Sequence, residues 1–334
     1  MKRPLSLLAV TAVGALWLST AEAVDGRVAS AAPKGTIWDR QWQAWRQAAT
    51  AAGFDFEYFV NGELGGETDI LNALRRGRIQ VAGTSSAAVA AVVPEVSVAL
   101  APYQFDSAAE ADFVYDRFLL PTLKDIAAGY GLHLMQWGEV GWSHIYATRS
   151  VREPGDVKAL KLRGPTNVPH QEFLRAVGAD AIPLGLPDIV PALQTGMIDG
   201  GIANVVLHTA TTAAFAPHYL LTAHIFDTNF FYANLDWYRR LPEARRRALD
   251  GLIVDPAAAR AEIRAMSEDL LAALRANPTA DVADVPPATL ARWRAAAAPA
   301  LARIVTQSGP RAAEVAQAIA AGRAAYKQQQ GGRP

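Results

Sequence analysis

The sequence predicts an α/β fold in which mostly parallel strands alternate with helices that cover them. From Arg27 to about Asp236, short apolar runs alternate with segments whose apolar residues recur at helical spacing. Strands joined by helices of this length favour parallel sheets that are buried on both faces. After Asp236 the pattern predicts helices alone. For a chain of 334 residues, we therefore expect about two α/β units followed by a helical tail.

Two spacings of apolar residues define the individual elements. In the segment FDFEYFV, every second residue from Phe54 to Val60 is apolar, which is the period of a strand. Trp38, Trp42 and Trp45 recur at the spacing of a helix face, where a core position is the usual explanation. On the same grounds, strands are predicted at 27–32, 54–60, 78–83, 133–137, 142–147 and 160–163, and helices at 38–49, around 71–74, at 107–128 and from 168.

The helical tail begins at Pro242 and is interrupted once. The interruption is the segment DPA, 255–257, where Asp255 can cap a helix and Pro256 can open its first turn. Two alanine-rich helices complete the chain. No segment rich in Gly and Ser separates the α/β units, so we expect strands and helices to connect them rather than a flexible linker.

The first residues carry the features of a secretory signal peptide. Lys2 and Arg3 precede an apolar stretch, 5–18, which is shorter than the about 20 residues that a membrane span requires. The small residues AEA at 21–23 offer a cleavage site. We therefore expect residues 1–23 to be removed after Ala23 and the mature protein to be periplasmic. A buried N-terminal helix is the alternative.

Composition and motifs exclude several classes of function. The formal net charge is +0, which does not favour nucleic acid or an anionic membrane as a partner. The sequence has no cysteine, so it forms no disulfide, and the six histidines show no spacing typical of zinc ligands. Neither a GxSxG elbow nor a phosphate loop nor a GxGxxG fingerprint is present. The sequence therefore predicts no catalytic residue, no cofactor and no metal ligand.

Arg163 is the strongest indication of a binding site. It ends the strand KLR, and Gly164 and Pro165 then stop the strand before a helix that begins near Val168. Open α/β sheets bind ligands where a strand ends and a helix begins, and a helix N-terminus favours an anion. A guanidinium presents a planar fork of donors that suits a carboxylate or phosphate. A surface salt bridge is the alternative explanation.

Five segments occur in the order typical of one protein family. They are APKGTIW (32–38), FVNGELGGETDILNALRRGRIQVA (59–82), GDVKALKLRGP (155–165), GADAIPL (178–184) and ALQTGMIDGGIANV (192–205). With these segments, the chain from about Val28 to Leu241 resembles the extracytoplasmic solute-binding proteins of TRAP transporters, the DctP family. The resemblance fades over the tail, where the DPA interruption departs from the family's long continuous helix.

The resemblance implies a periplasmic-binding-protein-like fold with two lobes, each a mixed sheet flanked by helices. Two hinge strands, around 139–146 and 228–235, and a long bridging helix after Pro242 would connect the lobes. The predicted boundaries are 24–138 plus 228–266 for lobe I, and 139–227 plus 267–330 for lobe II with the C-terminal helices.

The resemblance also implies the residues of the site. Arg163 matches the family's arginine that pairs with the substrate carboxylate. Thr166 occupies a contact position where Asn often stands, and Asn204 resembles the Asn that completes the pocket, although Ala203 aligns there equally well and Asn204 can instead cap a helix. Leu186 stands where an aromatic residue commonly covers the ligand. Ser85 lies in a loop that faces the cleft.

One position departs from the family's pattern. Many relatives carry a second arginine where this chain has Ser143. A single guanidinium favours a monocarboxylate or a keto or hydroxy acid over a dicarboxylate. Trp142 or His144 could supply the missing contact, although a histidine in a strand is commonly structural. Trp38 is the tryptophan of the helical stripe that we expect nearest the ligand.

The resemblance implies a receptor rather than an enzyme. It would bind a small organic acid by hinged closure and deliver it to integral membrane permease subunits that use an ion gradient. A binding protein for an ABC transporter or a sensor, and a periplasmic enzyme acting on organic acids, are the rival classes. The sequence leaves open the identity of the ligand, the help of a metal ion, and whether the expected monomer forms a helix-swapped dimer.

Overall fold

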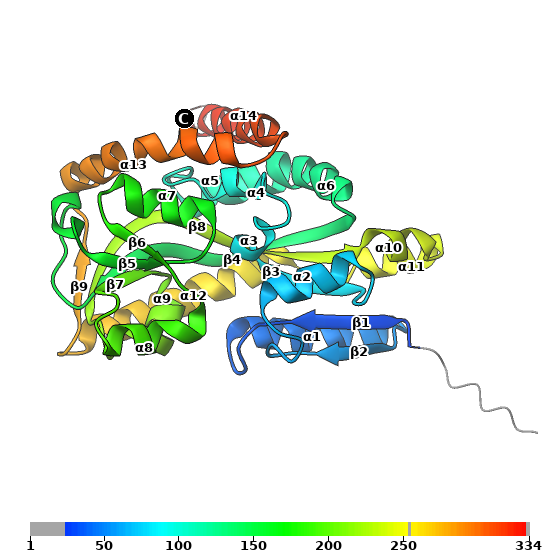
Figure 1. Ribbon diagram of the computed structural model, residues 1–334. Helices are drawn as coiled ribbons and strands as arrows, with labels where there is room; N and C mark the ends of the chain where they lie inside the picture. The colour runs from blue at the N-terminus through cyan, green and yellow to red at the C-terminus, as the bar shows by residue number, and fades with distance from the viewer. Residues whose placement is uncertain (1–23, 253–254, 332–334) are drawn as a thin grey trace, which may run out of the picture.

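A mixed sheet runs through the computed structural model, which describes residues 24–252 and 255–331 (Figure 1). Within these residues, nine strands are arranged in the order β2-β1-β3-β8-β4-β7-β5-β6, and β9 pairs with β8. The predicted signal peptide, residues 1–23 with cleavage after Ala23, lies outside the described residues. The strands are β1 (Gly26–Ser30), β2 (Phe56–Phe59), β3 (Val81–Ser85), β4 (Leu132–Ala147), β5 (Lys161–Gly164), β6 (Asp180–Pro183), β7 (Gly200–Ala203), β8 (His218–Asn234) and β9 (Asp281–Asp284).

Two sets of parallel strands are joined by two long antiparallel strands. Strands β1, β2 and β3 pair in parallel, as do β5, β6 and β7. Between the sets, β4 and β8 run antiparallel to each other along most of their length. We call the half around β1–β3 the first lobe and the half around β5–β7 the second lobe. This arrangement confirms the predicted α/β fold with a mixed sheet in each lobe and shared strands between them.

Strand β4 is one element where the sequence predicts two. The predicted strands 133–137 and 142–147 are joined in a single strand, whose pairing with β8 shifts register at three places. One shift lies between Glu139 and Gly141, and Gly141 has a φ of 111°, which a residue with a side chain rarely adopts. Such bulges bend a strand and re-aim its side chains. They therefore change the direction of the sheet where it passes between the lobes.

Helices cover both faces of the sheet. Figure 1 shows α13 and α14 lying along the top of the view, with α12 passing below β4. Among the described helices, none is both long and apolar enough to cross a membrane. The helices are α1 (Ile37–Ala51), α2 (Glu67–Arg75), α3 (Ser86–Val89), α4 (Val96–Ala99), α5 (Ala108–Val114), a π-helical turn (Tyr115–Leu119), α6 (Leu120–Gly129), α7 (Val168–Ala176), α8 (Ile189–Gln194), α9 (Val205–Leu207), α10 (Leu235–Arg240), α11 (Glu243–Asp250), α12 (Pro256–Ala276), α13 (Pro287–Gln307) and α14 (Ala312–Gly331).

Helix α1 confirms the prediction of a tryptophan stripe in the core. The Thr36 hydroxyl caps the helix by accepting a hydrogen bond from the Asp39 backbone N–H. Trp42 and Trp45 are buried, and their ring centroids lie 5.5 Å apart with the edge of one ring toward the face of the other. Trp38 is half-buried at the start of the same face. Trp42 and Trp45 therefore anchor α1 on the first lobe, whereas Trp38 packs against the core of the second lobe.

Helix α12 spans both lobes after the predicted interruption. Helix α11 ends at Asp250 and α12 begins at Pro256, inside the DPA segment, where Asp255 caps α12 by accepting a hydrogen bond from the Ala258 backbone N–H at 2.9 Å. Near its start, Arg260 forms ion pairs with Asp112 and Asp116 in the first lobe. Near its end, Leu274 belongs to the hydrophobic core of the second lobe. Helix α12 therefore connects the two lobes in addition to β4 and β8.

Of the last two helices, α13 packs on the second lobe and α14 on the first. Trp293 of α13 is fully buried against Phe173 in the second lobe. Val315 and Ile319 of α14 belong instead to the core of the first lobe. Residues 312–331 therefore lie on the first lobe, whereas the sequence placed them with 267–330 in lobe II. The other boundaries, predicted at 24–138 plus 228–266 for lobe I and 139–227 plus 267–330 for lobe II, stay a prediction.

The two glycines of the IDGG segment let β7 lie close to its neighbours. A Cβ on Gly200 would lie 2.2 Å from the Tyr146 backbone oxygen, and one on Gly201 would lie 2.7 Å from the Arg163 backbone oxygen. Neither oxygen can move without displacing β4 or β5, so a side chain at either glycine would separate these strands. The glycines thus keep the strand end of Arg163 in place.

Candidate functional site

A cavity of about 810 Å³ lies where the two lobes meet. Its wall contains the carboxyl-terminal ends of β3, β5 and β7, together with the first turn of α7 and part of β8. Ligands bind at the carboxyl ends of strands in open α/β sheets, because the loops and helix N-termini gather there. The volume is within the usual range for a site that binds a small molecule.

Arg163 lies buried in the wall of this cavity, 3% exposed. Its Nε donates a hydrogen bond to the Leu184 backbone oxygen at 2.9 Å. Among the described residues, the Arg163 side chain makes no other hydrogen bond. It also forms no ion pair with any described Asp or Glu. Burial lowers the pKa of Arg163, and Tyr146 and Asp227 oppose this shift. The terminal amino groups therefore remain for an anion that enters the cavity.

Helix α7 begins at Val168, shortly after Arg163 and where the sequence predicts it. Asn167 caps it by accepting a hydrogen bond from the His170 backbone N–H at 3.2 Å. Thr166 and Asn167 both line the cavity. The positive end of the α7 dipole lies next to the guanidinium, and both favour negative charge. The strand-to-helix junction thus makes this end of the cavity suitable for a carboxylate.

Asp227 is the centre of a second polar group in the cavity wall. Ser143 Oγ donates a hydrogen bond to Asp227 Oδ2 at 2.5 Å, and His170 Nε2 lies 3.2 Å from Asp227 Oδ1. The other ring nitrogen of His170, Nδ1, lies 2.7 Å from Asn167 Oδ1. Strand β8 carries the carboxylate, β4 the hydroxyl and α7 the imidazole. All four residues line the cavity.

The first lobe contributes a different polar pair. The backbone N–H and the hydroxyl of Ser85 both donate to the carboxylate of Glu67, each at 2.6 Å. Burial raises the pKa of Glu67, and the two hydrogen bonds from Ser85 oppose this shift. Trp38 lines the same side and donates from Nε1 to the Glu139 backbone oxygen at 3.4 Å. This wall therefore combines one aromatic face with one half-buried carboxyl group.

The structure brings most of the predicted site residues together. Asn204 combines the two roles considered for it, because it lines the cavity and its Oδ1 also caps α9 by accepting from the Leu207 backbone N–H at 2.9 Å. Leu186 is 52% exposed at the same cavity. The predicted residues that line it are Arg163, Thr166, Asn204, Ser85, Ser143, Leu186 and Trp38.

Trp142 and His144 do not line the cavity. Trp142 packs against Phe226, with ring centroids 4.9 Å apart. His144 accepts a hydrogen bond at Nδ1 from the Ala223 backbone N–H at 3.0 Å, and burial lowers its pKa to about 3. Side chains alternate along a strand, so the neighbours of Ser143 point away from the side on which Ser143 lies. Neither residue replaces the missing arginine at the cavity wall.

Sequence reasoning missed Asp227, His170 and Glu67. Asp227 belongs to no recognisable motif, and the spacing of the six histidines, His170 among them, indicates no zinc site. Glu67 belongs to the segment 59–82 that carries the resemblance, but the resemblance assigns it no role in the site. The described residues include no group of three or more Asp, Glu, His or Cys placed to hold a metal ion. The missed residues are better understood as hydrogen-bonding groups of the cavity.

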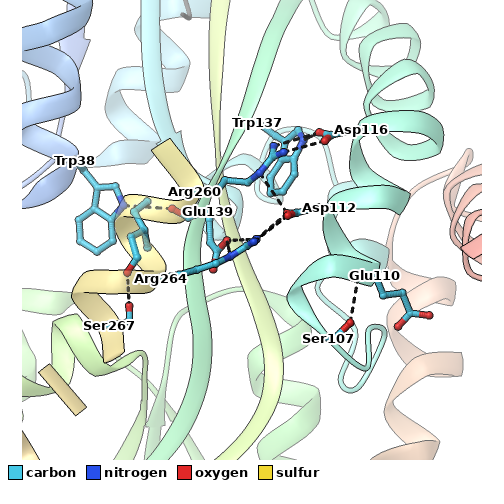
Figure 2. A network of polar contacts seen from close by, with 11 residues as sticks. Trp38, Ser107, Glu110, Asp112, Asp116, Trp137, Glu139, Arg260, Arg264 and Ser267 are labelled. Carbon is cyan, nitrogen blue, oxygen red and sulfur yellow. Dashed lines mark hydrogen bonds and ion pairs between the residues drawn. The ribbon is translucent and has the colours of Figure 1, made fainter. Parts of the chain in front are cut away.

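A network of ion pairs lies beside the cavity and connects α12 with the first lobe (Figure 2). Arg264 pairs with Asp112 at 2.7 Å and with Glu139 at 2.6 Å. Burial raises the pKa of Glu139, and Arg264 opposes this shift through hydrogen bonds and charge. Figure 2 shows Trp38 reaching the backbone of the same Glu139. The network thus couples the bridging helix, a connecting strand and the cavity wall.

Comparison with known proteins agrees with this architecture. The family described as bacterial extracellular solute-binding protein, family 7 (DctP), matches residues 27–308. A solute-binding protein of Verminephrobacter eiseniae is 28% identical over 268 residues, which cover 79% of each chain.

Two further relatives have known binding roles or structures. The ectoine-binding periplasmic protein TeaA of Halomonas elongata is 26% identical over 81% of this chain and 82% of its own, and the solved structure of that protein aligns with a TM-score of 0.84. A TRAP periplasmic solute-binding protein of Bordetella bronchispeptica, with density attributed to pantoate, aligns with a TM-score of 0.79 at 25% identity and covers 89% of this chain and 97% of its own.

Proposed function

The chain belongs to family 7 of the bacterial extracellular solute-binding proteins, the DctP receptors of TRAP transporters, and from this we propose that it binds a small monocarboxylic acid through Arg163 and delivers it to membrane permease subunits. The members of this family are receptors and not enzymes. Small organic acids suit the cavity because a single buried guanidinium lies beside a helix N-terminus.

The absence of a carboxylate partner for Arg163 among the described residues carries the proposal. A buried charge without a counter-ion costs several kcal/mol, and a protein usually avoids it. A carboxylate ligand would offset that cost by forming two parallel hydrogen bonds with the guanidinium. Arg163 is 3% exposed and donates within the protein only to the Leu184 backbone oxygen, as far as the described residues show. The side chain is therefore prepared for an incoming acid.

The charges around the cavity favour one carboxylate in the ligand rather than two. Among the described residues that line it, Arg163 is the one Arg or Lys, whereas Glu67 and Asp227 are acidic. A second ligand carboxylate would lie close to one of these acidic groups without a cation of its own. Ser143 stands where many relatives have a second arginine, and its hydroxyl is already bonded to Asp227. A dicarboxylate is therefore disfavoured.

The ligand would act as a clamp between the lobes. Arg163 and Thr166 come from the second lobe, whereas Ser85 and Trp38 come from the first. A ligand shifts the population toward the closed form only if it makes contacts there that the open form lacks. The bulged strands β4 and β8 and the bridging helix α12 provide the hinge. Closure then excludes water from the ion pair and presents a changed surface to the permease.

Thermal unfolding with a panel of organic acids tests this function. A true ligand at 100 times its Kd adds about 2.7 kcal/mol to the free energy of unfolding, and the melting temperature rises accordingly. We expect monocarboxylic acids to stabilise the protein and dicarboxylic acids of the same carbon number to leave it unchanged. Stabilisation by dicarboxylic acids alone, or by no acid in the panel, would contradict the proposal.

We also propose that the receptor is exported and processed. Residues 1–23 carry the signal-peptide features, and the family is extracytoplasmic. The full-length chain, expressed in a Gram-negative host, should appear in the periplasmic fraction with the mass of residues 24–334. A mass that includes residues 1–23 in that fraction would show that Ala23 is not the cleavage position.

A further inference from the structure

We propose that the ligand is a hydroxylated monocarboxylic acid, one of whose hydroxyl groups donates a hydrogen bond to Asp227 while its carboxylate is held by Arg163. This inference rests on the proposed function and adds a specificity-determining residue to it. It follows from the hydrogen-bonding roles of Asp227, Ser143 and His170, which the network around them determines.

The contacts of His170 with Asn167 and Asp227 determine which of its ring nitrogens donates a hydrogen bond. Asn167 Oδ1 accepts the His170 backbone N–H at 3.2 Å as the cap of α7, which identifies this atom as the amide oxygen. His170 Nδ1 lies 2.7 Å from the same oxygen and must therefore donate to it. His170 Nε2 lies 3.2 Å from Asp227 Oδ1, where two lone pairs would repel each other, so one of the two atoms carries a proton. The His170–Asp227 pair is then electrically neutral, whichever of the two holds the proton.

The part of this pair that faces the cavity offers acceptors and no donor. A carboxylate has about four acceptor positions. At Asp227, His170 Nε2 lies 3.2 Å from Oδ1, and the Ser143 hydroxyl donates its single hydrogen to Oδ2 at 2.5 Å. The remaining acceptor positions belong to a side chain that is 14% exposed and lines the cavity. A ligand group that lies there has to be a hydrogen-bond donor, because an apolar or acceptor group would leave these oxygens desolvated.

A neutral hydroxyl fits this position better than an ammonium group. The charge of Asp227 is already balanced by its pairing with His170, so a second cation would have no counter-charge of its own there. Asp227 and Arg163 line the same cavity. A short acid can therefore bind Arg163 with its carboxylate and reach Asp227 with a hydroxyl on the same carbon chain.

The fold places Asp227 in this position through the register of two strands. Asp227 pairs with Gly141, directly after the register shift between Glu139 and Gly141. The bulge bends β4 and lets Ser143, two residues further along, reach the carboxylate from the neighbouring strand. The acceptor group is thus built into the strands that connect the lobes, where closure brings the walls of the cavity together.

Matched pairs of acids test the inference on the mature protein by isothermal titration. Pantoate is compared with tert-butylacetate, which lacks only its two hydroxyls, and galactonate with hexanoate, which has the same number of carbon atoms. We expect at least one hydroxy acid to bind about tenfold or more tightly than its hydroxyl-free partner. In Asp227→Asn, which places an amide N–H among the acceptors, this preference should fall to about onefold. The exposed Asp180→Asn variant serves as the matched control and should keep the preference.

Each outcome of this test decides between the proposals. Hydroxyl-free acids that bind as tightly as their partners to the unmodified protein would overturn the inference without any variant. A preference that persists in a folded Asp227→Asn protein would also overturn it. Tighter binding of ε-aminocaproate than of both hydroxy acids would assign an ammonium group to the position instead of a hydroxyl. None of these three results would contradict the proposed role of Arg163. If no acid in the panel binds, the proposed function is contradicted as well.

Discussion

Replacing Arg163 by methionine weakens the binding of a monocarboxylic acid at least about 30-fold. The substitution keeps a similar length of apolar chain and removes the guanidinium that receives the carboxylate. Removing one partner of a buried, hydrogen-bonded charge pair typically costs 2–5 kcal/mol, and the lower value corresponds to about 30-fold in Kd. Because Arg163 forms no ion pair with the described residues, the variant should unfold at nearly the same temperature as the unmodified protein without ligand. Titration with the acid identified by thermal unfolding measures the loss.

Two further variants distinguish the role of the Arg163 guanidinium in binding from the general effect of removing an arginine. Arg163→Lys keeps the charge but loses the planar fork of donors. Its affinity for the acid should therefore lie between that of the unmodified protein and that of Arg163→Met. Arg247→Met removes an arginine from an exposed pair with Glu243 on α11 and should bind normally. Unchanged affinity in a folded Arg163→Met protein would show that the carboxylate binds elsewhere.

Replacing Arg264 by methionine destabilises the protein by about 3–5 kcal/mol at neutral pH, without direct contact with the ligand. Glu139 is 3% exposed, and Arg264 Nη2 lies 2.6 Å from its Oε2. Removing the cation leaves a buried carboxylate without its partner, which costs about 3–5 kcal/mol in comparable pairs. The same change removes one of the two pairs that Asp112 forms with α12 and leaves its pair with Arg260. Urea unfolding of the unliganded protein measures the effect, and Arg247→Met provides the exposed control, with an expected change within about 1 kcal/mol.

The loss in Arg264→Met should depend on pH in a defined direction. Burial already raises the pKa of Glu139 in the folded protein, and removing Arg264 takes away the main opposing influence. A carboxyl whose folded pKa lies above its unfolded value binds more protons when folded. Stability therefore falls as the pH rises from the unfolded pKa, about 4.3, through the higher folded pKa. Part of the lost stability should return on acidification relative to the unmodified protein. A loss that does not change with pH would show that Glu139 is not the unpaired group.

The position of Arg163 could be predicted because it depends on neighbouring residues. The KLR strand, its stop at Gly164 and the start of a helix near Val168 are all visible within a few residues of each other. The ends of parallel strands collect at one edge of a sheet, so a polar side chain there has a high chance of facing a site. The same local reasoning excludes Trp142 and His144 from the cavity wall when Ser143 lies there, since a strand alternates its side chains.

Asp227 and His170 could not be paired in advance, because their contact depends on long-range register. They are far apart in the sequence and meet only because β8 lies beside β4 and α7 lies over the end of β5. The position of α14 is a similar case. Its alanine-rich sequence predicts a helix but not the surface that it covers, which is the core of the first lobe.

Local order in the chain is enough to establish which segments are strands and helices, that the protein is of the α/β class, and that a guanidinium ends one of the strands. Those properties depend on the periodicity of side chains and on backbone preferences over a few residues. The acceptor group at Asp227, the polar wall around Ser85 and Glu67, and the ion pairs between α12 and the first lobe exist only in the folded molecule. They depend on the register of paired strands and on the packing of distant helices, and a single sequence does not encode these in any short pattern.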